Sequence, residues 1–238
     1  MFSLFDRKIT VEASGLLRGF TDCHCHLLPG VDDGVQTMDE TLAILSRYEQ
    51  LGVKDVWLTP HIMEDVPNTP ADLRQHFAQL KATYRGPIAL HLSAENMLDN
   101  LFIERFQSGD LLPWGKEGNR LLVETSYYTP PSNFHDLLRD IKSRGYFPML
   151  AHPERYVYMS TKEYHALKQQ GVEFQLNLFS LLGMYGSHAK DKAYQLLDEG
   201  LYNYVATDLH AHHVLETALT SKLSRKTIER IKVLSVGC

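Results

Sequence analysis

The sequence predicts an α/β fold in the form of a closed or nearly closed TIM-like barrel, and three observations support this. Seven short runs rich in Val, Leu, Phe and Tyr are bounded by turn residues, as buried strands are. Segments with helical spacing and helix caps lie between them, which implies parallel strands joined by right-handed crossovers. Seven such units in one chain favour a barrel over an open doubly wound sheet.

The order of the elements follows from these runs and from the cap residues between them. The predicted strands are Gly19–Cys25, Asp55–Thr59, Ile88–Ala94, Arg120–Thr125, Tyr146–Ala151, Val172–Asn177 and Tyr202–Thr207. The predicted helices follow caps at Thr37, Thr69, Asn133 and Ser160 or begin near Ser187, and a last helix follows Ser221. Thr37 with Glu40, and Ser160 with Glu163, have the spacing of capping boxes.

The chain is predicted to form one domain over residues 1–238, with residues 1–18 packed outside the barrel. Its formal charge of −5 gives no positive surface of the kind that binds nucleic acid. The apolar runs are too short for insertion into a membrane. Three cysteines are too few for a disulfide framework, and the first residues lack the pattern of a signal peptide, so the cytoplasm is the expected location.

Histidines and carboxylates stand where six of the seven predicted strands end. Parallel strands end at one rim of a barrel, and barrel enzymes build their active sites at that rim. Charged groups gathered there are costly to desolvate unless cations compensate them. The residues concerned are His24, His26, His61, Glu95, Glu124, His152, Asp208 and His210.

The loop after the first strand adds Asp32-Asp33-Gly34, from which a carboxylate can fold over the same rim. Imidazole and carboxylate ligands suit Mn, Fe, Zn or Mg, and eight or nine of them exceed the capacity of one ion, so two or three ions are expected. Arg155 follows His152 by three residues and is the expected guanidinium for phosphate oxygens. Each residue alone has a structural explanation, such as a core histidine or a helix cap, but their joint placement favours a metal site.

Other histidines and a group of tyrosines are less informative. His91 lies in the middle of a predicted strand and is interpreted as a core residue. His212 and His213 follow the last ligand candidates and are weighed as further site residues. The tyrosines that follow strand ends either line a substrate pocket or pack for stability. They are Tyr127, Tyr128, Tyr156 and Tyr158.

The motifs DCHCHLLPGVDDG, LTPHI, SAEN, LLVET, LAHPERY and ATDLH together resemble those of the polymerase and histidinol phosphatase (PHP) superfamily. From about residue 20 to about residue 210, the chain is most similar to the bacterial tyrosine-protein phosphatases of capsule and exopolysaccharide loci, the CpsB/CapC type. This resemblance implies a distorted (β/α)7 barrel with three divalent metals, manganese being the first choice. The metal ligands that it implies are His24, His26, Asp33, His61, Glu95, Glu124, His152, Asp208 and His210.

The same resemblance implies hydrolysis of phosphotyrosine on a cognate bacterial tyrosine kinase, whose phosphorylated tail regulates polysaccharide export. Arg155 would bind the phosphate, and His61 and Asp208 are expected to join it as catalytic residues. Many relatives carry a second arginine a few residues after the last Asp-x-His motif. This chain has Ala211-His212-His213 there, so His212 or His213 is a candidate replacement.

The expected mechanism is in-line attack on phosphorus by a metal-bridging hydroxide, without a covalent enzyme intermediate. A cysteine-nucleophile phosphatase needs an arginine six positions after its cysteine, whereas Cys23 and Cys25 are followed there by Pro29 and Val31. Two alternatives stay open. One is a small-molecule phosphoesterase such as a histidinol-phosphate phosphatase, and the other is a non-catalytic, metal-binding regulator of a kinase.

Overall fold

The computed structural model describes residues 7–234, which form parallel sheets surrounded by helices. The strands are β1 (Lys8–Thr10), β2 (Thr21–Cys25), β3 (Asp55–Leu58), β4 (His61–Ile62), β5 (Ala89–Leu92), β6 (Glu95–Met97), β7 (Arg120–Glu124), β8 (Phe147–Ala151), β9 (Glu173–Asn177), β10 (Tyr204–Ala206) and β11 (Lys222–Ser224). The helices are α1 (Met38–Leu51), α2 (Pro70–Thr83), α3 (Asn100–Ser108), α4 (Phe134–Ser143), α5 (Thr161–Gln169), α6 (Leu178–Leu182), α7 (Gly186–Asp198), α8 (His212–Thr220) and α9 (Arg225–Leu234), and a 3₁₀ turn covers Pro153–Arg155.

The strand pairings run continuously from β2 to β10 and then return to β2. One sheet has the order β2-β3-β5 and the other the order β10-β9-β8-β7-β6-β4, with every pair parallel. The chain passes from β3 into β4, and from β5 into β6, across breaks of two residues, so two chain segments belong to both sheets. An isolated bridge between Cys25 and Leu209 then joins the segment after β10 to β2.

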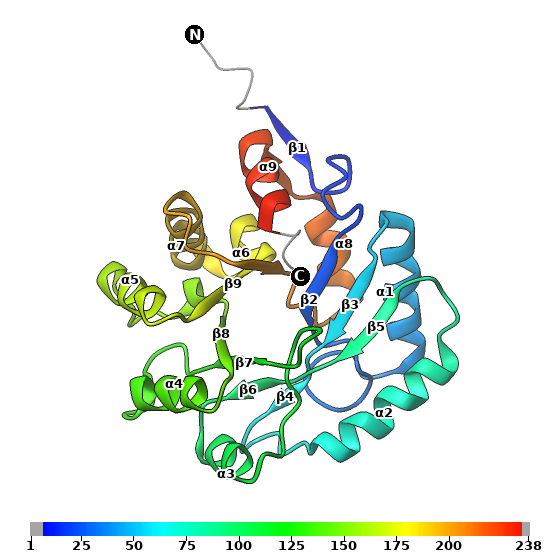
Figure 1. Ribbon diagram of the computed structural model, residues 1–238. Helices are drawn as coiled ribbons and strands as arrows, with labels where there is room; N and C mark the ends of the chain where they lie inside the picture. The colour runs from blue at the N-terminus through cyan, green and yellow to red at the C-terminus, as the bar shows by residue number, and fades with distance from the viewer. Residues whose placement is uncertain (1–6, 235–238) are drawn as a thin grey trace.

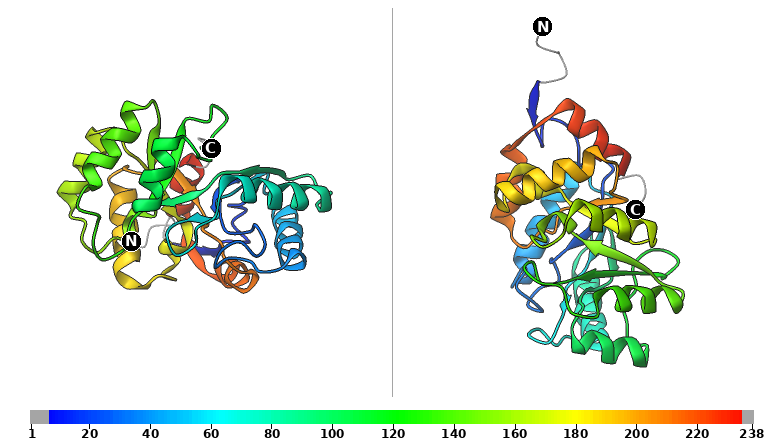
Figure 2. Two further views of the ribbon diagram at one scale, coloured as in Figure 1. Left: turned by 90° about the horizontal axis from the view of Figure 1, so that it is seen from below. Right: turned by 90° about the vertical axis from the view of Figure 1, so that its left-hand side faces the viewer.

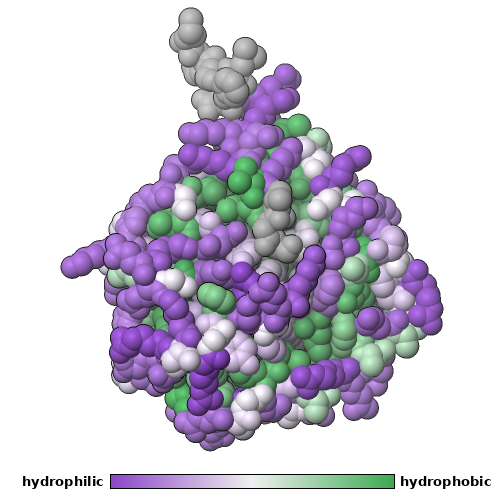
Figure 3. Space-filling model, in the orientation of Figure 1, coloured by the Kyte–Doolittle hydropathy of each residue, from purple (hydrophilic) through white to green (hydrophobic). Residues whose placement is uncertain are grey.

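The helices pack around the outside of the strands. Figure 1 shows α1 to α5 and α7 arranged around the strands, and the turned views in Figure 2 show the same helices on the periphery. Helix α1 turns Ile44, Leu45 and Tyr48 into the core, where each is fully buried. Polar residues cover most of the face in Figure 3. Among the described residues, no helix is long and apolar enough to cross a membrane.

The seven predicted strands are confirmed, with ends that differ by at most two residues apart from the break that separates β5 from β6. The capping box at Ser160 is complete, because Ser160 and Glu163 each accept a hydrogen bond from the other's backbone N–H. The box predicted at Thr37 is only half formed. Thr37 caps α1, but the Glu40 carboxylate turns away and accepts a hydrogen bond of 3.2 Å from the backbone N–H of His212.

The first and last described segments lie against each other. Strand β1 pairs with β11 in an antiparallel two-stranded sheet, and Val11, Leu16 and Leu17 behind it are at most 3% exposed. Of the extension predicted over residues 1–18, residues 1–6 lie outside the described part of the chain. The sequence did not predict β1, β4, β6, β11, α3, α6 or α8, which are all nine residues or shorter.

Candidate metal centre

The predicted site residues meet at the carboxyl ends of the strands. β2 carries His24 and ends just before His26, and β7 ends at Glu124. His61 and Glu95 follow the two-residue breaks after β3 and β5, as the first residues of the short strands β4 and β6. The remaining residues follow strands or lie in the loop before α1. These are His152 after β8, Asp208 and His210 after β10, and Asp33.

Eight of the nine predicted ligands fall into three adjoining groups, in each of which the ligand atoms lie within 4.8 Å of one another. The groups are His24, His26, Glu95 and Asp208; His26, Asp33, His61 and His210; and His61, Glu95 and Glu124. The ninth residue, His152, places Nε2 3.0 Å from Oε1 of Glu95. A neutral imidazole offers one lone pair, so His61 can serve only one of its two groups at a time.

The innermost group is fully buried and its ligand atoms are close together. His24 Nε2 lies 3.2 Å from Oε2 of Glu95 and 3.3 Å from Oδ1 of Asp208. His26 Nε2 lies 3.4 Å and 3.3 Å from the same two oxygens. Four ligands therefore surround one point that is largely shielded from solvent, since none of the four residues is more than 3% exposed.

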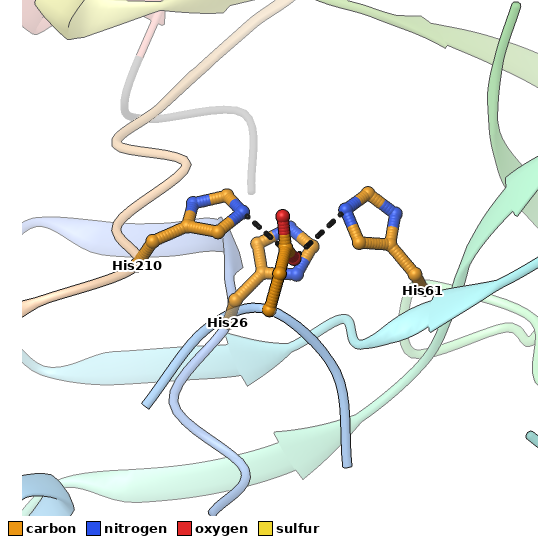
Figure 4. A group of neighbouring side chains, drawn as sticks. His26, His61 and His210 are labelled. Atoms are coloured by element: carbon orange, nitrogen blue, oxygen red, sulfur yellow. Dashed lines mark ion pairs between the residues drawn. The ribbon is translucent and has the colours of Figure 1, made fainter. Parts of the chain in front are cut away.

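Figure 4 shows the outer group, in which the rings of His26, His61 and His210 gather around one carboxylate. The dashed lines are the ion pairs of 3.5 Å that His61 Nε2 and His210 Nε2 make with Oδ1 of Asp33. The Asp33 side chain is 71% exposed, so this group lies at the mouth of the site.

The hydrogen bonds of His24 and His26 leave two lone pairs facing each other. His24 Nδ1 is 2.7 Å from Oε1 of Gln175, and His26 Nδ1 is 2.8 Å from Oδ2 of Asp32. Both contacts are to oxygen, so each Nδ1 donates and, in the neutral ring, each Nε2 carries a lone pair. These two Nε2 atoms are only 3.1 Å apart. Two lone pairs at that distance repel, so the arrangement requires a proton or a metal cation between them.

Buried polar atoms without a hydrogen-bond partner point to the same conclusion. Among the described residues they include His61 Nδ1, Glu95 Oε2, Glu124 Oε1 and His152 Nδ1. His61 Nδ1 is only 3.2 Å from Glu95 Oε2 and 3.1 Å from Glu124 Oε1, yet neither approach is a hydrogen bond. Buried polar atoms without a hydrogen bond cost free energy of folding. A divalent cation coordinated by these imidazole and carboxylate atoms would remove that cost.

The local field also favours positive charge. Burial lowers the pKa of His24, but the carboxylates of Glu95 and Asp208 outweigh it and raise this pKa to about 9. Burial likewise raises the pKa of Asp32, but the hydrogen bond with His26 outweighs it and brings this pKa to about 2. Surroundings that hold a proton on a buried imidazole this firmly also stabilise a metal cation.

Neutral amides and an additional carboxylate orient the ligands. Asp32 is buried and fixes the ring of His26, while Gln175 fixes that of His24. Asn177 donates from Nδ2 to Oδ2 of Asp208 at 2.9 Å. Such partners set the ring orientation and the tautomer of metal-binding histidines. Asp32 was expected only as one of two aspartates that could reach the rim, and Gln175 and Asn177 were not expected at the site, although two polar residues at alternate positions of a buried strand were a visible signal.

Two ligand candidates have a strained backbone. His152 has φ 33° and Asp208 has φ 53°, and they are the only residues other than glycine with positive φ in the described part of the chain. Such conformations cost about 1–3 kcal/mol each and gather at functional sites. His152 directly follows β8 and Asp208 lies two residues after β10, so in each case the left-handed turn at the end of a strand directs the side chain into the site.

Arg155 lies between two tyrosine rings beside the ligand groups. Its guanidinium carbon is 4.3 Å from the ring centre of Tyr127 and 4.2 Å from that of Tyr185, and one Nη donates to Asp208 Oδ2 at 3.0 Å. The two tyrosine rings therefore pack on the guanidinium, while its remaining N–H groups are available to donate to an anion. Arg155 lines a cavity of about 560 Å³ together with His213 and several of the ligand candidates.

The other candidates lie in different places. His213 lines this cavity, whereas His212 does not and supplies its backbone N–H to Glu40. Tyr127 also lines it, but Tyr128 is 75% exposed and Tyr156 is buried. The two cysteines of β2 point away from the histidines. Their thiols are buried and donate to backbone oxygens, which fits no nucleophile.

The fold and this site define a class: parallel α/β proteins that gather histidines and carboxylates at the carboxyl ends of their strands. Residues 20–230 match the family described as "Capsular polysaccharide synthesis, CpsB/CapC". Because this match covers most of the chain, the protein belongs to the CpsB/CapC family.

Relatives and a solved structure agree with this assignment. The chain is 28% identical over 230 residues to the tyrosine-protein phosphatase YwqE of Bacillus subtilis, covering 90% of each chain. It is 25% identical over 200 residues to the tyrosine-protein phosphatase CpsB of Streptococcus pneumoniae, covering 79% of this chain and 82% of the relative. A crystal structure from a study of these two proteins, described as "unique metal-dependent tyrosine phosphatases", has the same fold, with a TM-score of 0.73, 24% identity and coverage of 90% and 95%.

Proposed function

We propose that this protein is a metal-dependent protein-tyrosine phosphatase that acts on a phosphorylated tyrosine kinase of capsule or exopolysaccharide synthesis. The observation that carries the proposal is the juxtaposition of the Nε2 atoms of His24 and His26, 3.1 Å apart beside the two buried carboxylates of Glu95 and Asp208. The names of the relatives supply the substrate class. The kinase as partner rests on the family's place in polysaccharide synthesis.

The proposed metal ligands are the nine residues expected from the sequence, arranged as up to three ion sites. Manganese is the first choice among the metals that accept imidazole and carboxylate. We further infer a distorted (β/α)7 barrel in a single domain over residues 1–238, with residues 1–18 outside the barrel. The strand pairings that return to β2, and the packing of β1 on β11, support this arrangement.

Bound divalent cations would activate water and neutralise the phosphate oxygens. The chain's own residues would position the substrate. Arg155 is immobilised between Tyr127 and Tyr185 and would contact the non-bridging oxygens without further ordering. One Nη of Arg155 donates a hydrogen bond to Asp208. We therefore propose that Asp208 links this phosphate-binding arginine to the innermost ligand group. His61 lines the cavity and is proposed as the second catalytic side chain there.

The test is a rate comparison on purified, manganese-loaded protein with a phosphotyrosyl peptide and with histidinol phosphate. The proposal expects a clear preference for the peptide, complete loss of activity after chelation, and recovery when manganese is returned. A preference for histidinol phosphate would instead identify a small-molecule phosphoesterase. Turnover of p-nitrophenyl phosphate that neither His152→Ala nor Arg155→Ala reduces would leave the non-catalytic regulator as the better description.

A further inference from the structure

A second recess lies at the amino ends of the strands, away from the candidate metal centre. Its volume is about 250 Å³, and its lining comes from the first residues of β2, β3 and β7, from β5, and from the segment 114–117. It occurs where the two sheets separate. Among the strands that the structure describes, β5 pairs only with β3, while the first residue of β7, Arg120, pairs with Trp114 through an isolated antiparallel bridge.

Aromatic rings form the wall of this recess. The ring of His91 stacks on that of Trp57 at 4.6 Å, and Trp57 lies 5.2 Å from Trp114. Tyr204 packs against the other side of Trp114, also at 5.2 Å. His91 was expected in the core, but 35% of its side chain is exposed at this recess. The strand end is open there, because no neighbouring strand covers β5.

The recess contains a buried hydrogen-bond donor that lacks a partner. Trp114 is 2% exposed, and its Nε1 has no acceptor among the residues that the structure describes. Buried indole N–H groups normally find an acceptor, and leaving one unpaired costs about 1–3 kcal/mol. Because Nε1 itself is closed to solvent, an oxygen of a bound molecule would satisfy it after a small movement of the segment 114–117 that borders the recess.

The charged residues at the rim balance each other. Asp55 and Glu117 are acidic, while Lys116 and Arg120 are basic. Asp55 already contacts His91 at 3.1 Å, and Arg120 donates from Nε to Glu173 at 2.9 Å. This mixture of donors and acceptors without net charge favours neither an anion nor a cation. It suits a neutral molecule with several hydroxyl groups.

We propose that this recess binds one neutral sugar ring. The C–H faces of a sugar pack on aromatic rings, and its hydroxyls can bond with Thr21, Asp55 and the indole of Trp114. The volume is below the ~300–1,000 Å³ of pockets for drug-sized ligands, which fits a single ring. The chain's membership of a polysaccharide-synthesis family makes sugars available as ligands. The proposal does not depend on phosphatase activity.

The tryptophan content of the chain provides a direct assay. The sequence has two tryptophans, Trp57 and Trp114, and both line the recess, so intrinsic fluorescence reports on this place alone. We would titrate the full chain with methyl glycosides of glucose, galactose and N-acetylglucosamine, with a short oligosaccharide, and with inorganic phosphate. The expected result is a saturable change with at least one sugar, with a Kd on the order of 1 mM for so few atoms, and no change with phosphate.

Variants localise the binding. Asp55→Asn replaces a charged acceptor by a weaker neutral one, and Thr21→Ala removes a hydroxyl, so each should weaken the sugar affinity ~10-fold. His76→Ala, on α2 outside the recess, and Arg155→Ala, at the other site, should leave it unchanged. Circular dichroism checks the fold, and calorimetry provides a second measure of affinity.

Two results would overturn the assignment. One is the absence of a saturable response to every sugar in both fluorescence and calorimetry. The other is binding that Arg155→Ala abolishes while folded Asp55→Asn retains it, which would place the sugar at the opposite end of the strands. Equal affinity for a methyl glycoside and the oligosaccharide would assign a free sugar as ligand, whereas a tenfold preference for the oligosaccharide would assign the end of a glycan chain.

Discussion

Asp32 and Asp33 are adjacent aspartates in different surroundings, which makes them a matched pair for separating support of the fold from metal binding. The Asp32 side chain is fully buried. Its Oδ2 accepts from His26 Nδ1 and from the backbone N–H of His61 at 3.0 Å, and its Oδ1 accepts from the backbone N–H of Gly34 at 3.0 Å. Asp33 is 71% exposed and only approaches two imidazoles at 3.5 Å.

The expected effects follow from these contacts. Asp32→Ala removes the acceptor of two backbone donors, so at ~1–2 kcal/mol for each unpaired group the chelated protein should lose about 2–4 kcal/mol of unfolding free energy. Asp33→Ala removes an exposed side chain and should change that free energy by less than ~0.5 kcal/mol. Metal affinity should fall in both variants. In Asp32→Ala the loss of an orienting partner should weaken it ~10–100-fold.

Urea unfolding followed by circular dichroism, in the presence of a chelator, measures the first effect. Calorimetric titration with manganese measures the second. The reasoning fails if the two variants unfold alike in chelator, because the structure gives Asp33 no role in the fold. It also fails if Asp32→Ala binds manganese as tightly as the unmodified chain, since His26 would then need no orientation.

Three further predictions concern the phosphate-binding arginine, a helix cap and a half-buried tyrosine. Arg155→Ala should lower kcat/KM for a phosphotyrosyl peptide ~10²–10³-fold while the metal content, measured by elemental analysis, stays unchanged; loss of metal would contradict this. Ser160→Ala should lower the unfolding free energy measured in urea by ~1 kcal/mol. Asn133→Ala should leave it almost unchanged, because the Asn133 side chain makes no capping hydrogen bond. Equal losses in the two variants would contradict the assignment of Ser160 as the cap. Burial, together with Glu49, raises the pKa of Tyr84 to about 12, so the folded chain keeps a proton that the unfolded chain releases near pH ~10. Unfolding free energy should therefore fall between pH 10 and 12, less steeply in Tyr84→Phe, and identical slopes would count against this.

The strands were predictable because two local signals agreed. Each is a short apolar run, and each ends in a turn that the sequence marks. The helix caps were less certain, since a side chain can find a distant partner that local spacing does not reveal. Glu40 has the spacing of a capping box, yet its carboxylate accepts a hydrogen bond from the backbone N–H of His212, the first residue of α8, which lies 172 residues further along the chain. That partner is set by the packing of α1 against α8, which the sequence alone did not indicate.

The sequence indicated that the candidate residues would gather at one place, but not how they are arranged there. Parallel strands bring their ends together, so the residue types at those ends were sufficient to identify the ligand candidates. Nothing local distinguishes Asp32 from Asp33 as orienting or liganding residue, because the difference arises from how the loop folds over His26 and His61. The positive φ angles of His152 and Asp208 were likewise invisible, because the left-handed region is one that non-glycine residues rarely adopt.

One of the seven predicted strands, Val172–Asn177, is followed by no ligand candidate, and it explains how so many charges can share the centre. Strand β9 contributes Gln175 and Asn177, which orient His24 and Asp208 through neutral amides. A carboxylate at position 175 could accept the same hydrogen bond from His24, but it would add another negative charge beside Glu95 and Asp208. Like charges at this distance destabilise the buried ionised form. An amide orients the ring without adding a negative charge. The residues of β9 therefore position the ligands, while the charged ligand candidates come from the other segments of the site.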